Sequence, residues 1–421
     1  MGLTIAEKII ARASGRETVR SGELVWANVD MAMMQDCGGP RRIAYNLERL
    51  GVPIWDPDKV TVVSDHFVPP CNETEAHIQV VTRAWVKKYG VGRFHEFQGI
   101  CHIVAIERGY VRPGILMVGG DSHSCTGGAM GAMVVALGST DMLGVVVTGR
   151  TWLRVPKTIK IIWEGKLPLG TYAKDMVLAN LKQLGTAGAT YKVLEFTGDT
   201  VANLPLDERI ILTNMSIEMG AKTGIIAPDE TVLRYMEGRD VEFNPVYSDQ
   251  DAEYSQILVN QAEDLEPLVA CPHSPDNVIA ADLLNGVSID QALIGGCTGG
   301  KYHDLATAAT ILKGKKIATG TRLLVAPASQ QVLQRALADG VLETLLNAGA
   351  TLLPSACGPC GGLSMGLLGD GERCISSTNR NFRGRMGSSN SEVYLGSAAT
   401  VAASAVTGRI TDPRNFHREL R

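Results

Sequence analysis

Three cysteines in glycine-rich turns constrain this chain more than any other feature of its sequence. Cys297 stands in the run Gly-Gly-Cys-Thr-Gly-Gly, and Cys357 and Cys360 share the turn Cys-Gly-Pro-Cys-Gly-Gly. Glycines allow the main chain to approach a bulky ligand closely. A cubane iron–sulfur cluster needs an outside ligand at each of its four irons, and three cysteines would fill three of those positions. Because an open metal position is typical of a catalytic site, the turns predict a cluster that binds water or substrate at its fourth iron.

The same cysteines are compatible with two other kinds of site. A Cys-x-x-Cys turn can be a redox pair, although such a pair usually opens a helix in a small βαβ domain, and here Cys297 stands far upstream. Zinc could bind three cysteines and a histidine, but the chain has no second Cys-x-x-Cys turn and no closely spaced pair of histidines. A zinc-stabilised scaffold would hold one zinc ion per chain and no sulfide, which distinguishes it from the iron–sulfur hypothesis.

The length and composition of the chain are typical of a multidomain α/β enzyme. The 421 residues include 46 glycines, 45% are hydrophobic and 5% are aromatic, which suits many tight turns between strands and helices. The composition changes after Val155, and prolines gather in 267–275. We therefore expect three α/β domains, spanning residues 1–155, 156–270 and 271–421.

Charge and cysteine usage bear on partners and compartment. A net charge of -4 without a basic run gives no support for binding to nucleic acid or to an anionic membrane. The nine cysteines are an odd number, which favours free thiols in a reducing compartment over a disulfide framework. The apolar stretch 129–147 is interrupted by Gly131, Gly138 and Asp141, so it does not resemble a membrane span. We expect a cytoplasmic protein without a signal peptide.

A carboxylate and an imidazole directly follow a predicted core strand. The β-branched run 60–64 indicates a buried parallel strand, and Asp65 and His66 come immediately after it. A neighbouring carboxylate raises the pKa of an imidazole and keeps a proton available for donation near neutral pH. The alternative explanation is that His66 has a purely structural role, with its hydrogen bonds satisfied at the end of the strand.

Two further histidines extend this pattern. The strand predicted at 115–118 ends in a glycine-rich segment that carries Asp121 and His123. His102 lies inside an apolar segment, which taken alone favours packing in the core. Because the carboxyl ends of parallel strands meet at one edge of a sheet, three histidine-bearing strand ends together predict a pocket lined by histidines.

Polar residues at two other places are candidates for the same pocket. Gln35 and Asp36 lie beyond a strand predicted at 23–30 and precede a Gly-Gly-Pro turn. The alternative is a loop in which Asp36 caps the next helix. Asn214 and Glu218 are four residues apart, so we expect them on one face of a helix.

An arginine-rich segment indicates an anionic substrate. Residues 379–387 contain Arg380, Arg383 and Arg385 beside a glycine turn. A guanidinium group binds a carboxylate through two parallel hydrogen bonds. Combined with the acid–base residues and a Lewis-acid iron, this segment predicts hydration or dehydration of a small hydroxy acid.

Several of these motifs resemble the signatures of the aconitase superfamily. They are Asp121-Ser-His123, Cys297-Thr, Cys357-Gly-Pro-Cys360 and the segment 379–385. The resemblance runs along the chain from Gln35 to the ending Gly-Arg-Ile-Thr-Asp-Pro at 408–413. Within the superfamily the chain is most similar to the large subunits of 3-isopropylmalate dehydratase and homoaconitase. Hydratases and dehydratases acting on citraconate or 2-methylmalate, on 2,3-dimethylmalate or on maleate are the alternatives.

The resemblance implies three α/β domains around a [4Fe-4S] cluster, without the mobile fourth domain of single-chain aconitases. It also implies three groups of site residues. The cluster ligands would be Cys297, Cys357 and Cys360. The catalytic residues would be Asp65, His66, His102, Asp121, His123 and Glu218, with the first two as the acid pair that serves the leaving hydroxyl. The substrate-binding residues would be Gln35, Asp36, Asn214, Asn379, Arg380 and Arg385.

A partner follows from the same resemblance. A separate small subunit would supply the fourth domain and the serine base that removes the carbon-bound proton, in a heterodimer or heterotetramer.

Three departures from the family pattern concern the substrate: Thr-Gly-Gly follows Cys297 where Thr-Asn is common, Cys37 follows Asp36, and His303-Asp304 replaces an acidic pair. An iron sensor that binds RNA without catalysis is the alternative from another class of function, and the charge balance disfavours it.

Overall fold

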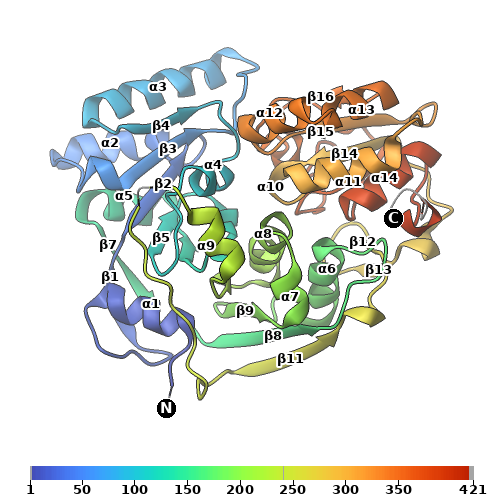
Figure 1. The fold of residues 1–421 in the computed structure, drawn as a ribbon. Coiled ribbons are helices and arrows are strands. Elements are labelled where there is room, and N and C mark those ends of the chain that lie inside the picture. The colour runs from blue at the N-terminus through green and yellow to red at the C-terminus, as the bar shows by residue number, and fades with distance from the viewer. Residues whose placement is uncertain (1, 240, 417–421) are drawn as a thin grey trace. The chain divides into compact units, whose positions relative to one another are not determined.

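The computed structural model describes residues 2–239 and 241–416, which form two compact units. Unit 1 comprises three stretches of the chain: Met1–Phe97, Cys101–Glu164 and Ala187–Asn260. Unit 2 comprises three others: Gln98–Ile100, Gly165–Thr186 and Gln261–Arg421. Both units contain parallel sheets with helices packed against them, which confirms the predicted α/β class (Figure 1). The division into three domains stays a prediction.

The main sheet of unit 1 has five parallel strands in the order β4-β3-β2-β5-β6. The strands are β2 (Met31–Gln35), β3 (Val60–Ser64), β4 (Arg93–Glu96), β5 (Leu116–Gly119) and β6 (Met133–Ala136). From β2 the chain moves outward to β3 and β4 and then returns to the opposite side of β2 as β5. The strand order therefore reverses between β2 and β5, and open α/β sheets bind their ligands beside such a reversal.

Helices pack against this sheet and follow local sequence signals. They are α2 (Pro40–Leu50), α3 (Glu73–Tyr89), α4 (Cys101–Glu107), α5 (Ser139–Thr148) and the 3-10 segment η2 (Ser122–Met130). Ala32 and Met34, alternate residues of β2, enter one buried cluster with α2, α3 and α5. Pro40 begins α2, and Asn72 caps α3 by accepting a hydrogen bond from the amide of Glu75.

A smaller sheet, a two-stranded ribbon and the N-terminal helix complete unit 1. The smaller sheet has the order β10-β9-β8-β11, and the ribbon pairs β1 with β7 antiparallel. These elements are α1 (Ile5–Ser14), β1 (Leu24–Asn28), β7 (Arg150–Arg154), β8 (Thr158–Glu164), β9 (Val193–Thr197), α7 (Asp199–Asn203), α8 (Leu206–Asn214), β10 (Thr223–Ile226), α9 (Glu230–Met236) and β11 (Gln256–Gln261). A capping box at Thr4 fixes the start of α1.

Unit 2 is built on a seven-stranded sheet in the order β13-β12-β18-β17-β14-β15-β16. Its strands are β12 (Leu268–Ala270), β13 (Val278–Ala280), β14 (Gln291–Gly295), β15 (Arg322–Ala326), β16 (Thr351–Leu352), β17 (Arg373–Ser376) and β18 (Glu392–Leu395). Its helices are α6 (Ala173–Leu184), α10 (Gly296–Gly299), α11 (Tyr302–Leu312), α12 (Gln330–Ala338), α13 (Val341–Ala348) and α14 (Ala398–Thr407). The strands from β18 to β16 are parallel, and their order reverses between β14 and β17.

The apolar stretch 129–147 forms the end of η2, then β6 and most of α5. Two of its glycines fall in the turns between these elements, since Gly131 ends η2 and Gly138 precedes α5, while Gly144 lies within α5. Within residues 2–239 and 241–416, no helix has both the length and the apolar character of a membrane span.

Candidate active site

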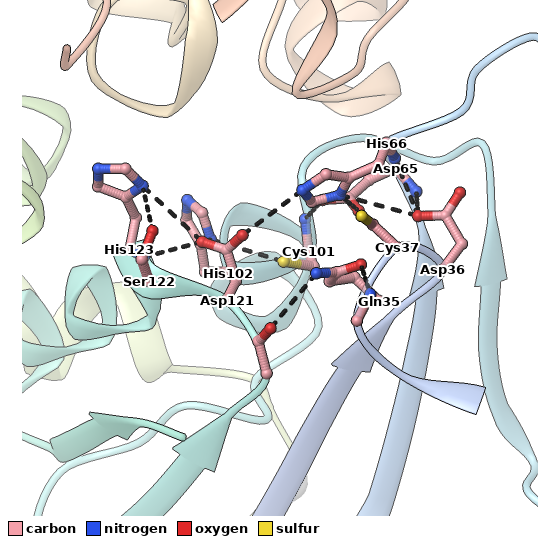
Figure 2. A network of polar contacts seen from close by, with 12 residues as sticks. Gln35, Asp36, Cys37, Asp65, His66, Cys101, His102, Asp121, Ser122 and His123 are labelled. Atoms are coloured by element: carbon pink, nitrogen blue, oxygen red, sulfur yellow. Dashed lines mark hydrogen bonds and ion pairs between the residues drawn. The ribbon is translucent and has the colours of Figure 1, made fainter. Parts of the chain in front are cut away.

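The carboxyl edge of the five-stranded sheet in unit 1 gathers acid–base side chains (Figure 2). Gln35 ends β2, Asp65 and His66 follow β3, and Asp121 follows β5. The Gln35 amide spans the reversal of strand order, because its Nε2 donates to the carbonyl oxygen of Gly120 at 3.3 Å. The predicted meeting of these side chains at one sheet edge therefore agrees with the geometry of unit 1.

Asp36 supports the turn after β3 and does not cap a helix. Its Oδ1 accepts hydrogen bonds from the main-chain amides of Asp65 at 3.3 Å and His66 at 3.0 Å. Its Oδ2 accepts from the amide of Phe67 at 3.2 Å and from Nε2 of Gln79 on α3 at 2.8 Å. The interpretation of Asp36 as a helix cap is wrong, since α2 begins after Gly39 and the fully buried Asp36 carboxylate serves the neighbouring strand end.

His66 lies between two carboxylates. Its Nδ1 is 2.6 Å from Oδ1 of Asp65, and its Nε2 is 3.6 Å from Oδ2 of Asp121. The other Asp65 oxygen accepts the main-chain amide of Cys101 at 2.7 Å, at the start of α4. Since Asp65 is fully buried, this bond and the contact with Nδ1 fix the ring of His66. Both ring nitrogens of His66 thus face a carboxylate.

Asp121 is the centre of a second group that contains His102 and His123. Nδ1 of His102 lies 3.7 Å from Oδ1 of Asp121, and the same oxygen accepts the amide of His123 at 2.8 Å. Burial alone would raise the pKa of Asp121, but the surrounding imidazoles, with that of His102 foremost, lower it to about 2. Burial lowers the pKa of His102 to about 4, against the attraction of Asp121. Near neutral pH, Asp121 is therefore ionised and His102 is neutral.

The structure does not place His102 at a strand end as the pattern predicted. His102 lies in the first turn of α4, and it is buried as its apolar surroundings indicated. Its Nε2 has no hydrogen-bond partner among the described residues. A buried nitrogen without a partner is available to a group that is absent from the protein chain itself.

Asn214 and Glu218 both contact η2, but not from one helix face. α8 ends at Asn214 and the chain tightens into the 3-10 segment η3 (Met215–Met219), so the predicted i, i+4 arrangement is wrong. Glu218 Oε1 lies 2.8 Å from Nε2 of His123, while Asn214 donates from Nδ2 to Oγ1 of Thr126 at 2.7 Å. The tighter helix thus delivers Glu218 to the histidine and leaves Asn214 to hold η2.

Unit 2 places two of the three predicted cluster cysteines against one asparagine. Cys297 lies on α10 directly after β14, and Cys360 lies on the 3-10 segment η6 (Gly358–Gly361). Sγ of Cys297 is 3.6 Å and Sγ of Cys360 is 3.8 Å from Oδ1 of Asn379, which follows β17. Cys357 immediately precedes η6. The three cysteines and Asn379 therefore share the carboxyl edge of the unit 2 sheet.

The donor set and its surroundings fit an iron–sulfur cluster better than a single metal ion. None of the three cysteines forms a disulfide with another described residue. One zinc ion with Zn–S bonds of about 2.3 Å would hold its sulfurs within about 4.6 Å of one another. Among the described residues only Asp36, Asp65 and His66 bring three such ligand atoms within 4.8 Å, so the cysteine sulfurs are more widely spaced. The buried hydroxyls of Ser355 and Ser364, which flank the turn, have no hydrogen-bond partner among these residues.

The arginine segment lies against the cysteine turn. Gly362 has a left-handed φ of 68°, and a Cβ atom there would come within 2.6 Å of the carbonyl oxygen of Arg385. Arg380 and Arg385 are half-buried, whereas Arg383 is exposed. The buried Nε of Arg385 has no hydrogen-bond partner among the described residues. This nitrogen is free to donate to a bound anion.

Sequence reasoning missed two buried lysines in unit 2. Lys174 on α6 is 2% exposed and Lys301 before α11 is 1% exposed. Lys174 stands on the apolar stripe of its helix with Val177 and Leu181, and a cation on such a stripe is the signal that could have identified it.

Comparison with known proteins yields one family and several close relatives. The model of the aconitase family (aconitate hydratase) matches residues 7–286 and 280–408. The 3-isopropylmalate dehydratase large subunit 1 of Methanopyrus kandleri is 48% identical over 99% of this chain and 100% of its own length. The 3-isopropylmalate dehydratase large subunit of Aquifex aeolicus is 44% identical over 98% of this chain and 97% of its own length. A probable methanogen homoaconitase large subunit of Methanosarcina mazei is 46% identical over 93% of this chain and 100% of its own length.

Proposed function

The chain belongs to the aconitase family, and on that basis we propose that it is the large, cluster-binding subunit of a hydro-lyase acting on a malate-type hydroxy acid. The substrate we favour is 3-isopropylmalate, which would place the protein in leucine biosynthesis. The observation that carries the proposal is the position of His66, with a carboxylate at each ring nitrogen. A proton held in this way can leave with a hydroxyl group as water.

Cys297, Cys357 and Cys360 would hold a [4Fe-4S] cluster. When bound, such a cluster supplies a Lewis-acid iron that coordinates a hydroxyl group and helps it to leave. The Asn379 amide, within 4 Å of two of the sulfurs, would fix the orientation of these ligands. The free hydroxyls of Ser355 and Ser364 support the assignment, since buried donors without partners need an acceptor.

His66 would act as the general acid in dehydration. The proton on Nε2 passes to the departing hydroxyl, forming water, and Asp65 holds Nδ1 so that the ring keeps its orientation. In hydration the same nitrogen takes the proton back from water. Asp121, ionised near neutral pH, would stabilise the positive charge that His66 carries before dehydration and again after hydration.

The other predicted catalytic residues would order the water molecule that is released in dehydration and added in hydration. His102 is neutral near pH 7 because burial lowers its pKa to about 4, so it acts as a hydrogen-bond partner and not as an acid. Glu218 orients His123 through their 2.8 Å contact. Asn214 would act indirectly, by holding η2 through Thr126.

Carboxylate recognition would fall to Gln35, Asn379, Arg380 and Arg385. The unpartnered Nε of Arg385 supports this assignment, since a buried guanidinium nitrogen needs an acceptor. For Asp36 the contacts support a different role from substrate binding. Its two oxygens already accept four hydrogen bonds, so we assign it to positioning the turn that carries Asp65 and His66.

A small subunit would complete the enzyme by supplying the serine base that removes the carbon-bound proton. The word large in the names of the relatives supports such a partner, in a heterodimer or heterotetramer. The free thiols of the chain suit the reducing cytoplasm.

An anaerobic turnover panel tests this proposal. The reconstituted chain is combined with the small subunit and supplied with 3-isopropylmalate, homocitrate, citraconate, 2,3-dimethylmalate or maleate, and the alkene acid is followed by absorbance. We expect turnover of 3-isopropylmalate. Preference for homocitrate would favour the homoaconitase activity named for one relative. If the enzyme carries a full cluster and converts none of these acids, the proposed hydro-lyase activity is contradicted.

A further inference from the structure

Lys174 is buried beside the loop that carries Asn379. It lies in the first turn of α6, and its ammonium group donates to the carbonyl oxygen of Thr378 at 2.5 Å and to that of Ser377 at 3.3 Å. The carbonyl of Thr378 belongs to the peptide bond that leads into Asn379. The position of this loop therefore depends on a lysine that is more than a hundred residues upstream.

The same loop is joined to the Cys297 turn. Oγ1 of Thr298 donates to the carbonyl oxygen of Ser377 at 2.9 Å, so this one oxygen accepts from both Thr298 and Lys174. A second buried lysine closes the arrangement, because Nζ of Lys301 donates to the carbonyl of Thr298 at 2.6 Å and lies 2.7 Å from Oδ2 of Asp304. The Thr298 hydroxyl thus joins the loops bearing Cys297 and Asn379, and each loop is held by one buried lysine, Lys301 and Lys174 respectively.

Electrostatics connects Lys174 to the cysteines. Burial lowers the pKa of Lys174 to about 8, and Lys301 lowers it as well, while Cys360 and Cys297 act in the opposite direction. The group is therefore mostly charged at neutral pH. A buried ammonium is stable only where hydrogen bonds and opposite charge replace its hydration. Three cysteine thiolates around a cluster would provide that opposite charge.

We propose that Lys174 is a positioning residue and a fixed positive charge for the iron–sulfur cluster. Its ammonium holds the loop 377–379 so that Asn379 reaches the sulfurs of Cys297 and Cys360, and its charge stabilises the anionic assembly of cluster and thiolates. This inference rests on the proposed function, in that it requires Cys297, Cys357 and Cys360 to be the cluster ligands.

Removing the charge tests the inference without relying on activity. Lys174→Met keeps the aliphatic stem, and Lys182→Met on the exposed side of the same helix is the matched control. After anaerobic reconstitution, iron and sulfide per chain, the rate of iron release to a chelator and the cluster midpoint potential are measured. We expect Lys174→Met to release iron about tenfold faster or more, because outer-shell partners of metal ligands typically contribute that much. Its midpoint potential shifts to a more negative value, because a positive charge favours the reduced cluster.

A second variant separates position from charge and guards against misfolding. Lys174→Gln keeps a donor for the Thr378 carbonyl but carries no charge, so it should show the negative shift in potential with a smaller increase in iron release. Circular dichroism and thermal melting of each variant establish that it is folded. A folded variant, of either kind, with wild-type potential and wild-type iron release would overturn the inference. Failure of the unmodified chain to take up iron and sulfide would instead remove the proposed function on which it rests.

Discussion

Two sheets of this protein share one strand order and carry different chemistry. In unit 1 the chain forms β2, β3 and β4 across one side of the sheet and then β5 and β6 across the other. In unit 2 it forms β14, β15 and β16 and then β17 and β18 in the same arrangement. Every neighbouring pair in both sets is parallel. The reversal of strand order lies beside aspartates and histidines in the first sheet and beside cysteines and an asparagine in the second.

The two edges differ in how their buried polar groups are satisfied. In unit 1, Asp36, Asp65 and Asp121 accept hydrogen bonds from main-chain amides or contact imidazoles of the same unit. In unit 2, the buried hydroxyls of Ser355 and Ser364 have no partner among the described residues. The carboxylates of the acid–base edge are thus held by protein groups, whereas Nε2 of His102 on that edge and the two hydroxyls in unit 2 are each open to a group from outside the chain. The same topology can serve either purpose because the strand ends only fix where side chains meet.

The largest effect is expected from removing one proposed cluster ligand. The loss of bound metal should be confined to the cysteine edge of the unit 2 sheet. Cys360→Ser is expected to lose iron and sulfide and to reduce turnover by about a thousandfold or more, since a Lewis-acid metal contributes several kcal/mol to the barrier. Iron and sulfide analysis, circular dichroism and turnover are the measurements. Cys71→Ser, at an exposed cysteine, is the control. Full retention of iron and sulfide in Cys360→Ser would remove Cys360 from the ligand set.

The complementary change in unit 1 should abolish turnover and spare the cluster. His66→Ala removes the imidazole between Asp65 and Asp121, and loss of a general acid typically lowers turnover by about a hundredfold to ten-thousandfold. Iron content and the visible spectrum should stay at wild-type values. His77→Ala on α3, at an exposed histidine, serves as the control. Unchanged turnover in His66→Ala would contradict its role as the acid.

A smaller effect should come from the residue that supports this turn. In Asp36→Asn one oxygen still accepts amide hydrogen bonds, but the other is replaced by a donor that faces the Phe67 amide and Gln79. We expect turnover to fall about tenfold with little change in KM, because we assign Asp36 to positioning His66 and not to binding substrate. The pH profile should also shift, since a carboxylate 3.7 Å from Nδ1 of His66 is lost. A raised KM with unchanged turnover would instead favour substrate binding, and exposed Asp58→Asn is the control.

The smallest effect concerns stability under acid and should be specific to unit 1. The pKa of His102 is about 4 in the fold and about 6.5 in an unfolded chain. Between these values the unfolded chain binds more protons, so the free energy of unfolding should decrease by about 2 kcal/mol between pH 7 and pH 5. His102→Gln should remove that decrease. An equally steep pH dependence in the variant would contradict a buried neutral His102.

Tryptophan fluorescence makes this measurement specific, because all five tryptophans belong to unit 1. They are Trp26, Trp55, Trp85, Trp152 and Trp163. Urea titrations of wild type and variant at both pH values, followed by this signal, report the unfolding of that unit. The difference between the two proteins isolates His102 from other titrating groups.

Local patterns predicted individual elements well and their ends less well. The strand predicted at 60–64 agrees with β3 to the residue, and the strand predicted at 115–118 agrees with β5 to within one residue, since their apolar runs mark them clearly. The segment around Asn214 was wrong, because an i, i+4 spacing says nothing about where an α-helix tightens into a 3-10 turn. The alternative of a helix cap at Asp36 was wrong for a related reason. Its four donors come from residues 65–67 and from Gln79, which local reasoning about a cap cannot include.

The sequence by itself determined the chemistry that this protein can carry, and the tertiary structure decided how the chemistry is arranged. Cysteines in glycine turns, carboxylates beside histidines and arginines near a glycine are visible in sequence because each motif is local. The shared strand order of the two sheets is not, since it depends on pairings between strands distant in the chain. Nor is the role of Lys174, a residue that looks misplaced on an apolar helix face until the carbonyls of Ser377 and Thr378 are placed against it. Side-chain type is a property of the chain, whereas burial and partnership arise only when distant segments pack together.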